Sequence, residues 1–264
     1  MIIDSNMAAV VTGGGSSLGE ATARMLAERG VKVALFDFNA ERGEKVAREI
    51  GGLFCHVDVT DERAVEDGLG QARAAHGQER ITVNCAGFVM AQKIASMDRE
   101  HGFYRPHDLN AFIRVVSTNL IGTFNVMSKS VAGMASLQPV NADGCRGVVI
   151  NTSSIASEEG QMGQVAVAAA KGGVRAMTLP AARDLAREGI RVCCILTGLF
   201  EISMFQALDE QVRKNLTADV PFPTRLGKPT EYAALVAHII ENDMLNGAAL
   251  RLDGALRLQA REPR

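Results

Sequence analysis

Two adjacent serines and one lysine are the residues whose types and spacing suggest chemistry in this sequence. Ser153 and Ser154 follow an apolar, β-branched run at residues 148–150, and Lys171 lies early in a helix predicted at residues 164–188. A continuous apolar run predicts a strand of a parallel sheet that is covered on both faces. Open α/β sheets bind ligands beyond the carboxyl ends of their strands. We therefore expect the serine hydroxyls and the lysine to face a ligand.

A glycine-rich turn near the N terminus is a second candidate site. The strand predicted at residues 7–11 leads through the sequence TGGGSSLG into a helix predicted at residues 20–29. Such a turn can hold a pyrophosphate with backbone N–H groups, although the same pattern also occurs as a plain strand-to-helix turn. Asp37 ends the next strand, predicted at residues 31–36, where a carboxylate can accept hydrogen bonds from both ribose hydroxyls. This arrangement favours NAD over NADP.

The elements that position these residues alternate between strand and helix. The other predicted strands lie at residues 53–57, 81–83, 190–196 and 248–252, and the other predicted helices at 61–76, 109–135 and 230–242. This alternation predicts an α/β fold, a single-domain Rossmann-type doubly wound sheet of seven mainly parallel strands with helices on both faces. The domain is expected to span residues 1–264, because α/β folds of this length commonly form one unit.

Two connecting segments are expected to border the ligand. Residues 88–107 are polar, irregular and longer than most connections, which is typical of a functional loop near a pocket mouth. Residues 199–225 are expected to form a substrate lid, although they also fit an ordinary amphipathic helix. The apolar side chains in the lid that suit an acyl chain or ring are Phe205, Leu208, Val212 and Phe222.

Composition excludes several classes of function. The net charge of −2 gives no basic surface for nucleic acid, and no apolar run approaches the length of a membrane span. No charged leader precedes the first strand, so a soluble, cytoplasmic protein is expected. The five cysteines lack CxxC spacing and predict buried, reduced thiols, and the five histidines lack metal-binding pairs, so no metal is assigned.

Together these motifs resemble the short-chain dehydrogenase/reductase family over nearly the whole chain. The segments GVVINTSSIASEEGQMGQ and KGGVRAMTLPAARDLAREGIRV, with the C-terminal segment from VPFPTRLGKPT onward, resemble the type-2 3-hydroxyacyl-CoA dehydrogenases. The resemblance implies that Asn119, Ser154 and Lys171 are catalytic residues, with the asparagine ordering a proton-relay water. The family's catalytic tyrosine falls at residue 167, which is valine in this sequence.

The resemblance also implies a set of NAD-binding residues. They are Gly13, Ser16, Ser17, Leu18, Gly19, Asp37, Asp58, Val59, Cys85, Ala86, Gly87, Gly198 and Phe200. Three site positions besides Val167 depart from the family. Ser17 replaces a glycine of the phosphate turn, Thr197 replaces a proline, and Ile202 replaces a threonine that would bind the nicotinamide carboxamide. NAD binding is therefore expected to be weakened or lost.

Three functions are compatible with these departures. The first is a catalytically degenerate subunit that supports an active paralogue in an NAD-dependent hydroxyacyl-CoA dehydrogenase complex. The second is an active NAD-dependent 3-hydroxyacyl-CoA dehydrogenase with a substitute base, for which Glu158 and Glu159 are the nearby candidates. The third is a protein that binds NAD or an acyl-CoA without turnover. The changes fall on groups that face cofactor or substrate while the core segments are retained, and this favours the first.

Association through two helices is expected from the same resemblance. The helices at residues 109–135 and 164–188 would form a four-helix seam with their mates, giving a dimer-of-dimers with an active paralogue, with itself, or with both. Their apolar residues recur at spacings that can cover an inward face and a second, partner-facing one. These residues are Val115, Val116, Ile121, Phe124, Val131, Val165, Val174 and Met177.

Overall fold

Seven strands form one sheet in the computed structural model, which describes residues 1–202 and 217–260. The order is β3-β2-β1-β4-β7-β8-β9, and all six neighbouring pairs are parallel, as predicted. The chain winds outward from β1 in both directions, so the strand order reverses between β1 and β4. The strands are β1 Ala8–Thr12, β2 Lys32–Asp37, β3 Leu53–His56, β4 Ile81–Asn84, β7 Gly147–Ser154, β8 Ile190–Thr197 and β9 Ala249–Leu252.

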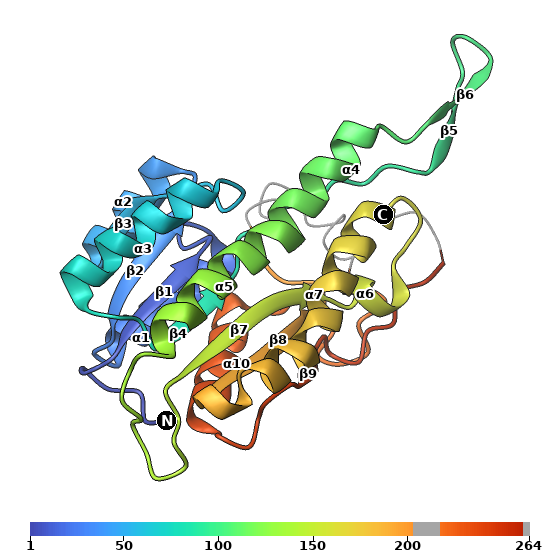
Figure 1. The fold of residues 1–264 in the computed structure, drawn as a ribbon. Coiled ribbons are helices and arrows are strands. Elements are labelled where there is room, and N and C mark those ends of the chain that lie inside the picture. The colour runs from blue at the N-terminus through green and yellow to red at the C-terminus, as the bar shows by residue number, and fades with distance from the viewer. Residues whose placement is uncertain (203–216, 261–264) are drawn as a thin grey trace.

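Helices cover both faces of this sheet (Figure 1). Helices α1, α2 and α10 lie together on one face, and α3, α5 and α7 lie on the other. The helices are α1 Ser17–Glu28, α2 Ala40–Ile50, α3 Glu62–His76, α4 Leu109–Val116, α5 Thr123–Met134, α6 Ala156–Glu159, α7 Val165–Asp184 and α10 Pro229–Glu241. A 3₁₀ turn, η2 Ala186–Glu188, follows α7.

The central strands are buried on both faces, which explains their continuous apolar sequences. Val10 packs with Phe36 in the core on the α3 side, and the next residue, Val11, packs in the core on the α1 side. In β7, Ile150 and Val149 likewise belong to different cores. Because both faces are fixed by packing, the carboxyl ends of β1, β4, β7 and β8 are held in register at one edge, where the site residues emerge.

The helix predicted at residues 109–135 is interrupted by a π-helical segment, η1 Ser117–Gly122. Asn119 lies in this segment, and the hydroxyl of Thr123 donates to the Asn119 carbonyl over 2.9 Å. A wide π turn leaves backbone groups without their usual helical partners, and such turns commonly occur at functional sites. Helical spacing in the sequence gave no sign of this interruption.

The segment at residues 88–107 is not irregular throughout, so that part of the prediction was wrong. Strands β5 Ala95–Asp98 and β6 Phe103–Pro106 form an antiparallel hairpin. Figure 1 shows this hairpin projecting from the body beyond the start of α4. Only the first part of the segment borders the main cavity, through Phe88 and Val89.

Two helices within residues 1–202 and 217–260 had not been predicted. The first, α2, begins after Asn39, whose side chain accepts from the Arg42 N–H, and ends at Gly51 in a left-handed conformation. The second, α6, is a single turn after β7. Helix α2 has few apolar residues among many charged ones, and α6 has only four residues, so neither stands out as an apolar segment of the sequence.

The predicted lid lies largely outside the described residues. Phe205, Leu208 and Val212 all fall within 203–216, whereas Phe222 is described and 82% exposed. The lid therefore stays a prediction.

Over the described ranges, no helix is long and apolar enough to cross a membrane, and no group of three or more His, Cys, Asp or Glu residues is placed to hold a metal. All five cysteines are free, and four are buried.

Candidate active site

A cavity of about 420 Å³ opens at the carboxyl ends of β4, β7 and β8. All four positions that the sequence placed at the reaction centre line it, namely Asn119, Ser154, Val167 and Lys171. They come from η1, β7 and α7, which are separated in sequence and brought together by the parallel sheet. The predicted grouping of these residues is therefore present.

The two serines of β7 have different roles. The Ser153 hydroxyl donates to the Lys171 carbonyl over 2.8 Å and so ties the strand to α7. The Ser154 oxygen accepts from the Ala156 N–H over 3.1 Å. Because a serine hydroxyl both donates and accepts, this contact leaves the Ser154 proton for a ligand in the cavity. Ser154 is the serine that can polarise a substrate oxygen.

Lys171 extends from α7 toward the sheet, and its Nζ donates to the Thr152 carbonyl over 2.8 Å. Burial lowers the pKa of this ammonium to about 8, and the neighbouring thiols of Cys194 and Cys85 act weakly in the opposite sense. No ion pair joins Lys171 to a carboxylate over residues 1–202 and 217–260. The lysine is therefore a partly desolvated amine at the wall of a cavity.

Val167 stands one helical turn before Lys171 on the same face of α7. Its side chain is 4% exposed and belongs to an apolar cluster with Val115, Ala166 and Ala170. It also lines the cavity, so the position from which the family's tyrosine would reach the ligand presents only methyl groups. A valine has no proton to donate or accept.

Asn119 is fully buried, and its amide makes a two-way contact with the backbone of Phe88. Its Oδ1 accepts from the Phe88 N–H over 3.0 Å, and its Nδ2 donates to the Phe88 carbonyl over 2.8 Å. A Cβ on Gly87 would lie 2.3 Å from Asn119 Oδ1, so glycine is required for this approach. The side chain thus holds the segment after β4 against η1, and its relay role stays a prediction.

The glycine turn adjoins a second cavity of about 500 Å³. The lining residues include Gly13, Ser16, Asp37, Asp58, Val59, Ala86 and Gly87. The Asp37 carboxylate accepts from the Gly15 N–H over 2.9 Å and from the Asn39 N–H over 2.8 Å, which fixes its position at the cavity. Ser16 and Gly87 line both cavities, so the two adjoin near the start of α1. Two adjoining cavities suit the two halves of a dinucleotide.

Close packing explains the other glycines of the turn. Gly13 adopts a φ of +64°, and a Cβ there would lie 2.9 Å from the Ala86 nitrogen. A Cβ on Gly19 would lie 2.2 Å from the Gly13 carbonyl oxygen, so Gly19 shapes the turn without lining either cavity. The predicted residues Leu18, Cys85, Gly198 and Phe200 line the main cavity.

All three departures from the family besides Val167, namely Ser17, Thr197 and Ile202, line the main cavity. Ser17 adopts a φ of +32°, a left-handed value that glycine accepts more readily than serine, and it lines the main cavity. Ile202 lines the same cavity and packs against the central core. Thr197 ends β8 and donates its hydroxyl to the Ser153 carbonyl over 3.1 Å.

The two carboxylates considered as substitute bases are held in an ion-pair network. Glu159 pairs with Arg251 over 2.6 Å, and Glu158 pairs with Arg251 and, over 3.0 Å, with Arg175. Neither glutamate lines the main cavity. The structure therefore argues against either residue as the base, because each faces a guanidinium on the outer side of α6.

Sequence reasoning missed several lining residues. Gln161, Gln164 and Leu258 line the main cavity. All three lie in segments that carry the family resemblance, but nothing in their residue types or spacing marked them as site residues. Leu258 arrives from beyond β9, and only the tertiary fold brings it there.

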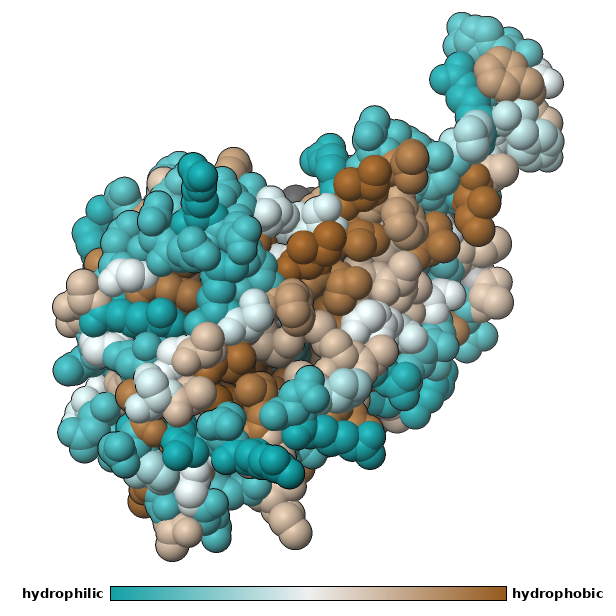
Figure 2. Space-filling model, viewed as in Figure 1, coloured by the Kyte–Doolittle hydropathy of each residue, from teal (hydrophilic) through white to brown (hydrophobic). Residues whose placement is uncertain are grey.

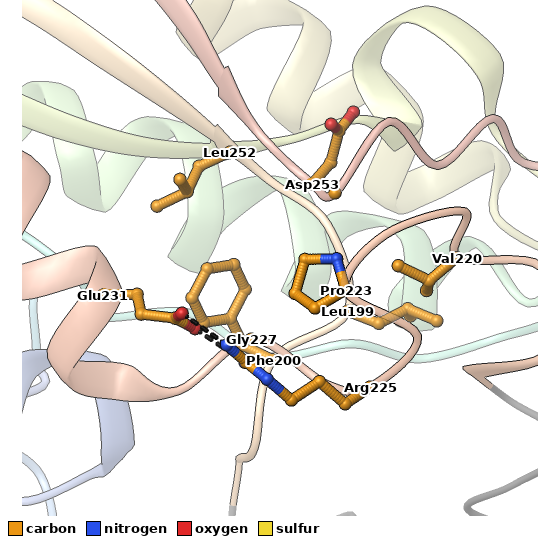
Figure 3. Close-up of a pocket in the computed structure, with 10 residues that line it drawn as sticks. Leu199, Phe200, Val220, Pro223, Arg225, Gly227, Glu231, Leu252 and Asp253 are labelled. Carbon is orange, nitrogen blue, oxygen red and sulfur yellow. Dashed lines mark hydrogen bonds and ion pairs between the residues drawn. The ribbon is translucent and has the colours of Figure 1, made fainter.

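A smaller cavity of about 120 Å³ is lined in part by Phe200 (Figure 3). There Arg225 donates twice to Glu231, over 2.7 and 2.9 Å, and chiefly through these bonds lowers the pKa of that carboxyl to about 2.

The sheet order and the helices on both faces define a domain of the Rossmann type. Comparison with known families places the match at residues 7–213, with the short chain dehydrogenases. This chain belongs to the short-chain dehydrogenase family. Proteins with this fold typically bind NAD(H).

Individual relatives match over almost their whole length. The chain is 47% identical to 3-hydroxyacyl-CoA dehydrogenase type-2 of Drosophila melanogaster over 255 residues, which covers 96% of this chain and 98% of the relative. It is 46% identical to the protein of that name from Homo sapiens, with 96% of each chain covered. A crystal structure of 3-hydroxyacyl-CoA dehydrogenase type-2 from Mycobacterium avium matches with a TM-score of 0.90 and 38% identity, covering 98% of both chains.

Proposed function

We propose that this chain is a catalytically degenerate subunit of an NAD-dependent hydroxyacyl-CoA dehydrogenase complex, in which an active paralogue performs the chemistry. The observation that carries the proposal is Val167. It lines the cavity beside Ser154 and Lys171 but packs as an apolar residue. General acid/base catalysis contributes about 10²–10⁴-fold to a rate, and valine cannot provide it.

The substrate class follows from the relatives and from the cavity. The relatives are named as 3-hydroxyacyl-CoA dehydrogenases, and a 3-hydroxyacyl thioester presents one secondary hydroxyl beside an apolar chain. The cavity offers the hydroxyl of Ser154 for that oxygen, with Val89, Ile155 and Leu199 for the chain. Ser154 would bind and orient the oxygen, and Lys171 would supply a positive charge.

The residues at the glycine turn fit a bound NAD. Asp37 would accept from the adenosine ribose, and the N terminus of α1 would face the pyrophosphate. When bound, NAD supplies hydride-accepting chemistry. The proposal includes weakened binding, because Ser17 places a side chain in the turn and Ile202 offers no hydrogen bond to the reactive ring.

Exposed apolar residues support association with a chain of the same fold. Phe124 and Ile121 are 55% and 52% exposed, although they lie on long helices of a well-packed domain. Leu109 and Ile113 extend the same apolar surface along α4, and Figure 2 shows apolar residues gathered over α4 and α5. Large exposed apolar patches indicate an interface. We propose a dimer-of-dimers, formed with itself or with the active paralogue, in the cytoplasm.

Co-expression tests the proposal. The chain should be produced alone and together with each intact paralogue from its own genome, and NAD reduction should be followed with 3-hydroxybutyryl-CoA. The isolated chain should show negligible turnover, and a stable mixed oligomer should form with one paralogue. Steady turnover by the isolated chain would overturn the degenerate assignment. If the chain forms no mixed oligomer with any intact paralogue, the proposed complex would be overturned.

The observation that both cavities persist favours a second candidate, a protein that binds NAD or an acyl-CoA without turnover. The adenosine side keeps Asp37, Asp58 and Val59 at the cavity wall. Calorimetric titration with NAD and with acetoacetyl-CoA separates this candidate from the first. The second candidate requires that the isolated chain binds one of these ligands without a partner subunit.

A further inference from the structure

We propose that Lys171 acts as an amine nucleophile that captures the ketone carbonyl of a 3-ketoacyl thioester as an imine. The acyl-thioester class rests on the proposed function, whereas the nucleophile rests on the geometry of the cavity. The proposal gives the cavity a chemistry that needs neither a tyrosine nor a hydride acceptor.

The Lys171 amine is positioned where it can reach a bound carbonyl. Lys171 lines the main cavity, and its Nζ would lie 3.6 Å from a Cβ placed on Gly87, at the point where the two cavities meet. Its hydrogen bond to the Thr152 carbonyl uses one N–H and holds the chain in this direction. Val167, one turn earlier, presents no hydroxyl to it.

The surroundings of the Lys171 amine favour its neutral, nucleophilic form. Apolar side chains of Phe88, Ile155 and Val167 share the cavity wall with Lys171, and a lysine amine in an apolar pocket is activated toward carbonyl carbons because its charged form is disfavoured. The ionisable groups that face it are Cys85 and Cys194. Burial raises the pKa of both thiols, that of Cys194 to about 11, so both are uncharged near neutral pH.

The hydroxyl of Ser154 lies in the same cavity and can bind the carbonyl oxygen. It accepts from the Ala156 N–H and keeps its own proton for a ligand oxygen. A carbonyl that accepts this proton in a hydrogen bond becomes more electrophilic at carbon. The tyrosine-free site thus retains a donor for the oxygen and a nucleophile for the carbon.

The step balances without an oxidant or reductant. The neutral Lys171 amine adds to the ketone carbon and gives a carbinolamine. The carbon–oxygen bond then breaks, the oxygen leaves as water with the two amine protons, and a carbon–nitrogen double bond remains. Hydrolysis reverses the step, so the imine is a reversible covalent complex.

Reductive trapping tests the proposal. The intact protein is incubated with acetoacetyl-CoA, treated with sodium borohydride, and mapped by peptide mass spectrometry. An adduct on Lys171 is expected, and Lys171→Met and Lys171→Arg should abolish it. Lys45→Arg removes an exposed lysine on α2 and should leave it unchanged. Modification of Lys171 no greater than that of Lys45 would overturn the proposal.

The pH dependence gives a second readout. Only the neutral amine attacks, so labelling of Lys171 should rise with pH and reach half its limit near 8. At pH 7.5 the neutral fraction should exceed that of an ordinary lysine by about 10²-fold. Labelling that rises only above about pH 10, as for an exposed lysine, would count against an activated amine.

Two further measurements separate this proposal from the proposed function. Calorimetric binding of acetoacetyl-CoA without trapping on Lys171 would overturn the nucleophile and leave the acyl-CoA class intact. Trapping of hexanal on Lys171 without acetoacetyl-CoA binding would support the nucleophile and remove the acyl-CoA class. Thermal melts of both Lys171 variants establish that they fold.

Discussion

Val167 and Lys171 lie one turn apart on α7, and both line the main cavity, but only the lysine brings a polar atom to it. The valine is 4% exposed and completes an apolar cluster with residues of α4. The position that the family resemblance assigns to the catalytic tyrosine is thus occupied by an apolar side chain that packs against α4.

Restoring the tyrosine alone should restore little dehydrogenase activity. Val167→Tyr returns the hydroxyl, but Ser17 and Ile202 still border the cofactor path. We expect the triple variant with Ser17→Gly and Ile202→Thr to exceed Val167→Tyr by about 10-fold or more, since Ile202→Thr restores a hydrogen bond worth about 0.5–1.5 kcal/mol and Ser17→Gly relieves a left-handed conformation that costs about 1 kcal/mol. NAD reduction with 3-hydroxybutyryl-CoA measures this. Val167→Phe, which has the ring without the hydroxyl, is the control. Full activity from Val167→Tyr alone would show that Ser17 and Ile202 do not impair the site.

Ser17→Gly should tighten NAD binding and stabilise the protein slightly. Ser17 adopts a left-handed φ of +32°, which costs a non-glycine residue about 1 kcal/mol. Calorimetry with NAD and thermal denaturation provide the two measurements. Ser16→Gly is the matched control, because Ser16 has an extended φ of −139° and should gain nothing from glycine. Equal effects at both positions would remove the conformational explanation.

Removing Arg251 should destabilise the fold. Arg251 is 21% exposed, pairs with Glu158, Glu159 and Asp253, and donates to the Leu256 carbonyl. Arg251→Met removes these four contacts, although Glu158 keeps Arg175 and Asp253 keeps Arg257, and should cost about 1–3 kcal/mol in the free energy of unfolding. Arg48→Met removes an exposed pair at 3.6 Å and should cost less than about 0.5 kcal/mol. Urea titration compares the two, and equal losses would contradict a structural role for the network.

Stability should rise with pH in the alkaline range because of Lys171. Its pKa in the folded protein is about 8, below its value of 10.5 when exposed, so the unfolded chain binds the extra proton between these values. The wild-type protein should therefore gain stability relative to Lys171→Met as pH rises from about 8 to 10.5. Below pH 8 the difference between the two proteins should be constant. Urea denaturation at several pH values tests this, and a constant difference over the whole range would show that the amine is not desolvated.

A charge on the exposed face of α5 should disrupt association. Phe124→Glu places a carboxylate in the apolar surface proposed as the interface, where burying an unpaired charge costs several kcal/mol. Light scattering should show a smaller particle. Met244→Glu changes a side chain that is 92% exposed and lies in the connection between α10 and β9, and it should leave the mass unchanged. An unaltered mass for Phe124→Glu would move the interface elsewhere.

The alternation of apolar strands with helices was enough to predict the doubly wound sheet. Strands such as β7 and β8 carry no polar alternation because both faces are covered, and that pattern is local in the sequence. The glycine turn, Asp37, Ser154 and Lys171 were predictable for the same reason, since each follows a strand or opens a helix at a fixed offset. The edge of a parallel sheet then brings them together.

Tertiary structure decided what local patterns do not contain. The pairing of Asn119 with Phe88, the π-helical turn around it and the arrival of Leu258 at the cavity depend on contacts between distant segments. The roles of Glu158 and Glu159 were decided in the same way, because their partner Arg251 lies far along the chain, on β9. Sequence fixes which groups are present. Only the packed fold sets which of them are desolvated, paired or turned toward the ligand, because those properties depend on neighbours in space.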